Sequence, residues 1–92
     1  MASEMTIVIK ADRFSHHDAC EVSRLALQAA PAQRVIIDLG RAGEAETSAF
    51  AQLVQLRRRL LRGGGDLSLR GLRDHAAGLY EVNRLDRILP RN

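Results

Sequence analysis

Apolar and polar residues follow one another along the chain in short segments whose spacing predicts strands and helices. Residues 5–10 are rich in β-branched side chains and are too few for a helix, which is typical of a strand. Residues 35–39 form an apolar run interrupted only by Asp38, as expected of a strand buried on both faces. Residues 66–70 alternate between polar and apolar side chains and predict a third strand.

The first two helices are predicted between these strands. Ser15 is the expected N-cap of the first, Asp18 completes a variant of the capping box, and Pro31 ends the helix. The second helix, over residues 47–62, is strongly amphipathic, and the glycines at 63–65 supply left-handed backbone for its end.

The C-terminal part predicts a third helix over about residues 74–84, capped by Asp74. The pattern over residues 85–89 allows a short edge strand before Pro90. Strands alternating with helices imply right-handed crossovers, and so a largely parallel sheet. We therefore expect a single α/β domain over residues 1–92, with its helices mainly on one face of the sheet.

Composition narrows the class of protein. Aromatic residues make up 3% of the chain, so the core must be aliphatic. The net charge of +3 comes mostly from arginine, but acidic residues are interspersed and no aromatics alternate with the arginines, so a solvated helix face explains them better than nucleic-acid binding. No apolar stretch is long enough to span a membrane, no secretory signal is visible, and the single Cys20 rules out an intrachain disulfide. We therefore expect a cytoplasmic protein.

Two groups of residues resemble reactive sites. Asp38, at the end of a predicted strand, is either a catalytic acid or a cap of the following loop, and the lack of a nucleophile placed beside it favours the cap. His16 and Cys20 have helical spacing next to His17 and Asp18, but two ligands on one face do not close a zinc site. We expect no metal, no cofactor and no enzymatic activity.

Thr47 and Ser48 lie where a buried strand and its loop lead into the long helix. One of the two is expected to be the helix N-cap, a common position for hydroxyl residues. A phosphate on either would meet free backbone N–H groups and the positive end of the helix dipole. It would also add about −1.5 to −2 charges to the surface.

The order and spacing of these segments, over about residues 33–90, resemble the STAS domain, the fold of bacterial anti-sigma-factor antagonists. The matching segments are Val35–Leu39, Glu46–Ala49, Leu53–Leu61, Gly64–Gly65, Leu67–Leu72 and Leu85–Pro90.

The resemblance implies regulation by binding. An unphosphorylated antagonist of this family binds a GHKL-type anti-sigma serine/threonine kinase and frees the sigma factor, and phosphorylation breaks the complex. Thr47 would then be the phosphoacceptor, with Glu46 as the preceding acid and Ser48 as the second choice. Weak homodimerisation is a further expectation. The implied partner surface is Glu46, Thr47, Ser48, Ala49, Ala51, Gln52 and Gln55.

Other STAS domains are constitutive subunits of lipid-handling ABC transporters and bind the ATPase without a phosphorylation cycle, which is the alternative for this chain. The sequence departs from the family pattern at three places. The acid is Glu46 where aspartate is usual, and Ala49 replaces a glycine and would add a methyl group to the docking surface. The N-terminal pair of strands is shortened to one clear strand.

Overall fold

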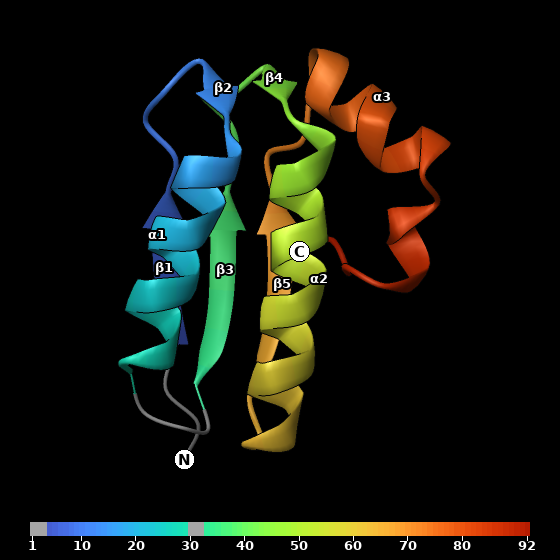
Figure 1. The fold of residues 1–92 in the computed structure, drawn as a ribbon. Helices are drawn as coiled ribbons and strands as arrows, with labels where there is room; N and C mark the ends of the chain where they lie inside the picture. Colours follow the sequence, from blue (N-terminus) through green and yellow to red (C-terminus); the bar gives the residue numbers. More distant parts are fainter. Residues whose placement is uncertain (1–3, 30–32) are drawn as a thin grey trace.

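Three parallel strands form the main sheet, in the order β1-β3-β5 (Figure 1). The computed structural model describes residues 4–29 and 33–92. It places β1 at Glu4–Val8, β3 at Arg34–Asp38 and β5 at Asp66–Arg70. The bounds of β5 are those predicted, and β3 and β1 begin one residue earlier than predicted. The central strand β3 is paired on both sides, which confirms the parallel sheet.

The helices lie mainly on one face of this sheet. Figure 1 shows α1, His16–Leu27, and α2, Thr47–Arg62, side by side in front of the strands. The third helix, α3 at Asp74–Val82, lies beyond β5 on the side away from β1. The bounds of α2 and the one-sided arrangement are both as predicted. No helix of the described residues is long and apolar enough to cross a membrane.

The core fills the space between the sheet and these helices. The rings of Phe14 and Phe50 meet edge to face with centroids 6.0 Å apart, and aliphatic side chains supply the rest. Ile36 is also buried, although it belongs to the opposite face of the sheet, where its register neighbours are Thr6 and Ser68. The predicted burial on both faces is confirmed for Val35–Ile37, whereas Asp38 at the end of the strand is half-buried. The fully buried strand and helix residues include Val35, Ile37, Leu67, Leu69, Ala19 and Leu53.

The capping box of α1 is confirmed. The backbone N–H of Asp18 donates to Ser15 Oγ at 3.1 Å, and the backbone N–H of Ser15 donates to Asp18 Oδ2 at 3.2 Å. The helix ends at Leu27 with Gln28 as its C-cap. The predicted stop at Pro31 lies outside the described residues.

Two glycines make the turn between α2 and β5 for different reasons. Gly64 has a φ of +87°, a left-handed conformation that costs glycine little. Gly65 is required by space, because a Cβ there would lie 2.3 Å from the carbonyl oxygen of Gln33. The carboxyl end of α2 is therefore pressed against the backbone that leads into β3.

The predicted strand over residues 85–89 is wrong. The chain there forms a short 3-10 helix, η1 at Leu85–Arg87, because the buried residues Leu85 and Leu89 are four apart, as in a helical turn. The residues that cover the edge of β5 come after η1. The N–H of Leu69 donates to the carbonyl of Pro90 at 2.8 Å. The buried Tyr80 hydroxyl donates to the Leu89 carbonyl at 2.6 Å and holds this segment in place.

The start of α3 also differs from the prediction. Arg73 occupies the N-cap position without a side-chain capping bond, and Asp74 is the first helical residue. Two further strands were not predicted. They are β2 at Arg13–Phe14 and β4 at Glu44–Ala45, which pair in parallel as a second small sheet. Each of these strands has only two residues, which is too few for an alternation of polar and apolar side chains to reveal it in the sequence.

We expect Gly65→Ala to lower the free energy of unfolding by about 2–3 kcal/mol, because the new methyl group overlaps a backbone oxygen that cannot move aside easily. Gly78→Ala is the matched control. A Cβ at Gly78 meets nothing within 4 Å, so alanine should stabilise α3 by about 0.5–1 kcal/mol. Urea unfolding of both variants tests the pair, and equal stabilities would contradict the packing at Gly65.

Candidate functional site

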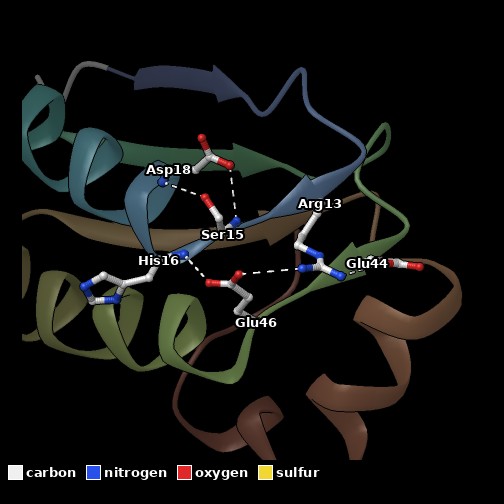
Figure 2. Close-up of polar contacts among 6 residues, drawn as sticks. All are labelled: Arg13, Ser15, His16, Asp18, Glu44 and Glu46. Carbon is white, nitrogen blue, oxygen red and sulfur yellow. Dashed lines mark hydrogen bonds and ion pairs between the residues drawn. The ribbon is translucent and has the colours of Figure 1, made fainter.

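The two long helices begin at the same corner of the molecule (Figure 2). Strand β2 leads into α1 and strand β4 leads into α2, and their parallel pairing sets Arg13 beside Glu44. The backbone N–H of Glu46 donates to the carbonyl of Phe14 at 2.9 Å and extends this pairing by one residue. The first turns of α1 and α2 are therefore held side by side by main-chain hydrogen bonds.

The side chain of Glu46 joins the two helices. Its Oε1 accepts a hydrogen bond from the backbone N–H of His16, the first residue of α1, at 2.8 Å. Its Oε2 lies 3.9 Å from Nη1 of Arg13, as Figure 2 shows. A carboxylate at a helix N-terminus satisfies a free N–H group and interacts favourably with the helix dipole. Glu46 thus occupies the N-cap position of α2 with its backbone but caps α1 with its carboxylate.

Neither Thr47 nor Ser48 is the N-cap of α2, which corrects the prediction. Glu46 holds that position and makes no side-chain capping bond to α2, since its carboxylate is turned toward α1. Thr47 and Ser48 are both exposed in the first turn. The N–H of Ala49 donates to the Glu46 carbonyl at 3.0 Å, whereas no hydrogen bond of the described residues uses the N–H of Thr47 or Ser48. The hydroxyls and N–H groups of these two exposed residues therefore make no hydrogen bond within the part of the chain that the structure describes.

A groove of about 280 Å³ runs along the outer side of α2. One wall follows the helix from Thr47 through Ala51 to Arg58, and Asn83 and Leu85 form the other wall. Between them, Phe50 and Val54 supply apolar surface and Gln55 supplies an amide. We call this feature the α2 groove. The predicted phosphoacceptor lies at one end of it and an arginine at the other.

A large apolar side chain at the end of α3 is strongly exposed. Val82, the last residue of α3, is 80% exposed and immediately precedes the groove residue Asn83. Arg84 follows with a φ of +53°, so the chain turns sharply here. The Val82 side chain is therefore available for contact with another protein.

The predicted partner surface divides into three parts. Thr47, Ala51 and Gln55 line the α2 groove, and Ser48 is exposed beside it. Gln52 faces α1 and donates to Sγ of Cys20 at 3.3 Å. Ala49 is fully buried, which corrects the expectation that its methyl group lies at the docking surface. Its alanine side chain fills the core, so a partner cannot touch it.

Asp38 acts as the cap of the following loop. Its Oδ1 accepts the backbone N–H of Gly40 at 2.9 Å, which confirms the favoured structural interpretation. Its Oδ2 lies 3.8 Å from Nε of Arg70 on the neighbouring strand. His16 Nε2 lies 3.5 Å from Cys20 Sγ, but the described residues contain no group of three or more potential metal ligands.

Sequence reasoning missed several residues of this corner and groove. Arg13 was not singled out because its partner Glu44 lies in another strand, and nothing in the sequence relates the two. Arg58 was among the arginines explained as a solvated helix face. It lies on the same helical stripe as Thr47 and Ala51, since Ala51 follows Thr47 by four residues and Arg58 follows Ala51 by seven. That stripe was the available signal. Asn83 and Leu85 reach the groove only through the fold of the C-terminal segment.

A protein-family model described as Mlab, STAS domain matches residues 4–90. The match includes β1 and α1, which lie outside the 33–90 segment on which the resemblance was based. A comparison with curated proteins found no match.

We expect Glu46→Ala to destabilise the protein by about 1 kcal/mol, because the N–H of His16 loses its acceptor at the start of α1. Glu44→Ala provides the control, since Glu44 pairs with the same Arg13 at 3.4 Å through side chains that are both 61% exposed. Such exposed pairs contribute little, so its loss should change stability by less than about 0.5 kcal/mol. Urea unfolding measures both, and a larger loss for Glu44→Ala would contradict the capping role of Glu46.

Proposed function

The chain belongs to the STAS domain family, and we propose that it is a non-enzymatic protein-interaction regulator of the anti-sigma-factor-antagonist type. The observation that supports this most is the position of Thr47, exposed in the first turn of α2 and lining one end of the α2 groove. A protein bound in this groove would cover the hydroxyl. A phosphate on the Thr47 hydroxyl would lie between the two proteins, within their interface.

The α2 groove supplies the docking surface in this proposal. Ala51 and Val54 on α2 and Leu85 opposite offer apolar contact, and the exposed Val82 precedes the groove residue Asn83 in the chain. Arg58 gives the far end a positive charge for which no ion pair is found among the described residues. Such a surface suits a partner segment with an apolar face and an acidic residue, because a basic rim favours an acidic partner. The proposed partner is a GHKL-type anti-sigma kinase.

Phosphorylation of Thr47 would reverse the electrostatics at the near end of the groove. The phosphate would bring about −1.5 to −2 charges next to the carboxylate of Glu46, which is fixed on α1 and cannot turn away without losing its bond to His16. The free N–H groups of Thr47 and Ser48 would hold the phosphate on the protein itself. A partner that had packed against a neutral threonine would then face a solvated dianion and would dissociate.

The alternative function is that of a constitutive subunit bound to the ATPase of a lipid-handling ABC transporter. The 80% exposure of Val82 favours this alternative, since permanent interfaces are more apolar than transient ones. The two proposals use the same groove and differ in whether Thr47 is a switch. Both place the activity of the chain in binding and not in catalysis.

We expect Thr47→Glu to weaken binding to the cognate kinase at least about tenfold, equivalent to about 1.4 kcal/mol, because a carboxylate then occupies the groove end. Thr47→Ala should bind as tightly as the unmodified protein and should accept no phosphate from the kinase and ATP. Calorimetric titration and mass spectrometry of the kinase reaction provide the two measurements.

Ser48→Ala is the control for this experiment, since Ser48 is exposed in the same turn but does not line the groove. It should keep both binding and phosphorylation. If Thr47→Ala and Thr47→Glu both bind the kinase like the unmodified protein, the switch is refuted. Stable copurification with an ATPase, unaffected by either variant, would establish the transporter alternative.

We expect Ala51→Arg to reduce partner binding at least about tenfold under either proposal, because the long side chain fills the middle of the α2 groove. Gln28→Arg adds the same side chain at an exposed position after α1 and should leave binding unchanged. Affinity capture with each tagged variant, followed by quantitative mass spectrometry of the kinase or ATPase, makes the comparison. Equal capture by the two variants would show that the partner binds elsewhere.

A further inference from the structure

Within residues 4–29 and 33–92, the main sheet has one covered edge and one open edge. At the β5 edge, the N–H of Leu69 donates to Pro90 and the carbonyl of Leu69 accepts from the N–H of Asn92 at 2.6 Å. At the other edge, β1 pairs only with β3, and no other segment of residues 4–29 or 33–92 pairs with it. Figure 1 shows β1 as the outermost strand on that side.

The open edge presents unpaired main-chain groups. The N–H of Ile9 donates to the carbonyl of Asp38 at 3.0 Å, so Ile9 is directed toward β3. Successive residues of a strand direct their N–H and C=O groups to opposite sides, so Thr6 and Val8 direct theirs away from the sheet. A row of this kind is a template for a further strand.

Apolar surface lies directly beside these groups. A groove of about 290 Å³ runs between β1 and α1, with Ile7, Val22 and Leu25 among the residues that line it. Val8 and Leu25 remain 42% and 41% exposed, which is high for large apolar side chains. A strand added to β1 would cover part of this surface in addition to making main-chain hydrogen bonds.

The charges next to the edge indicate which strand fits. The segment considered is residues 4–10, which is β1 and the two residues after it. Glu4 and Lys10 are exposed at its two ends and form no ion pair with any of the described residues. If two copies of the segment pair antiparallel about Ile7, Glu4 of each copy lies opposite Lys10 of the other. The same register sets Thr6 opposite Val8, and both of these have outward-directed main-chain groups. A register centred on Thr6 would instead set Glu4 opposite the apolar Val8.

We propose that this edge is a homodimer interface, in which β1 of a second copy of the chain pairs antiparallel with β1 about Ile7. The pairing joins the three-stranded sheets of two copies into one continuous sheet and forms two symmetric Glu4–Lys10 ion pairs. Opposite charges at facing positions of an antiparallel pair are favourable. The dimer is weak, because the paired segment is short. It leaves the α2 groove free, since α3 and the groove lie on the side away from β1.

The symmetry of the proposed pairing gives a decisive experiment. Glu4→Lys alone sets lysine opposite lysine, and Lys10→Glu alone sets glutamate opposite glutamate, so each variant should dimerise at least about tenfold more weakly than the unmodified chain. An equimolar mixture of the two variants restores both ion pairs and should dimerise like the unmodified chain. Sedimentation equilibrium from about 10 μM to about 1 mM covers the range expected for a weak dimer.

Two controls distinguish pairing through β1 from association through another surface and from a loss of folding. Glu81→Lys makes the same charge change on α3 and should leave dimerisation unchanged. Recovery in the mixture shows that the single variants are folded, because an unfolded chain could not regain the dimer. The proposal is overturned if the unmodified chain stays monomeric at about 1 mM, if both variants dimerise alone as it does, or if mixing them restores nothing.

Discussion

The parallel pairing of β3 on both of its sides is the constraint on which the rest of the molecule depends. It aligns the three strands so that Val35 and Ile37 share a face with Leu67 and Leu69, and this face receives both long helices. It also brings the carboxyl ends of the strands to one end of the sheet, where the connecting segments run into α1 and α2. Because that alignment is parallel, the two helices start together and point the same way.

The corner where they start illustrates how a family pattern is adapted. The acid before the proposed phosphoacceptor is a glutamate here, one methylene longer than the usual aspartate, and its carboxylate reaches the first N–H of the neighbouring helix. The alanine in place of the usual glycine is fully buried. The glutamate therefore joins α2 to α1, the alanine methyl group lies in the core, and Thr47 stays exposed beside them. The two departures from the family pattern therefore affect the contacts inside this corner, and neither alters the exposed hydroxyl of Thr47.

Features of the fold that depend on neighbouring residues could be predicted from the sequence, whereas contacts between residues far apart in the chain could not. The bounds of α2 and β5 are given by local periodicity, because each element has one face buried along its whole length. The β2–β4 pair and the bond from His16 to Glu46 join residues about thirty positions apart, and no local pattern records them. The segment after α3 was mistaken for a strand because its apolar residues are few, and their four-residue spacing becomes informative only when their burial is known. The sequence predicted part of the α2 wall of the groove, because residues on one face of a helix recur at regular spacing. It did not predict the wall formed by Asn83 and Leu85, which no regular spacing relates to α2.

The C-terminal residues 90–92 have a role that extends beyond stability. They close the β5 edge with main-chain hydrogen bonds, and Tyr80 anchors the residue that precedes them. With one edge closed, pairing through the other edge ends at two copies, a closed assembly. A chain that had lost this short segment would have two open edges, and edge-to-edge pairing could then continue from molecule to molecule without limit. If the β1 edge pairs as proposed, residues 90–92 would limit the assembly to two copies by keeping the β5 edge covered.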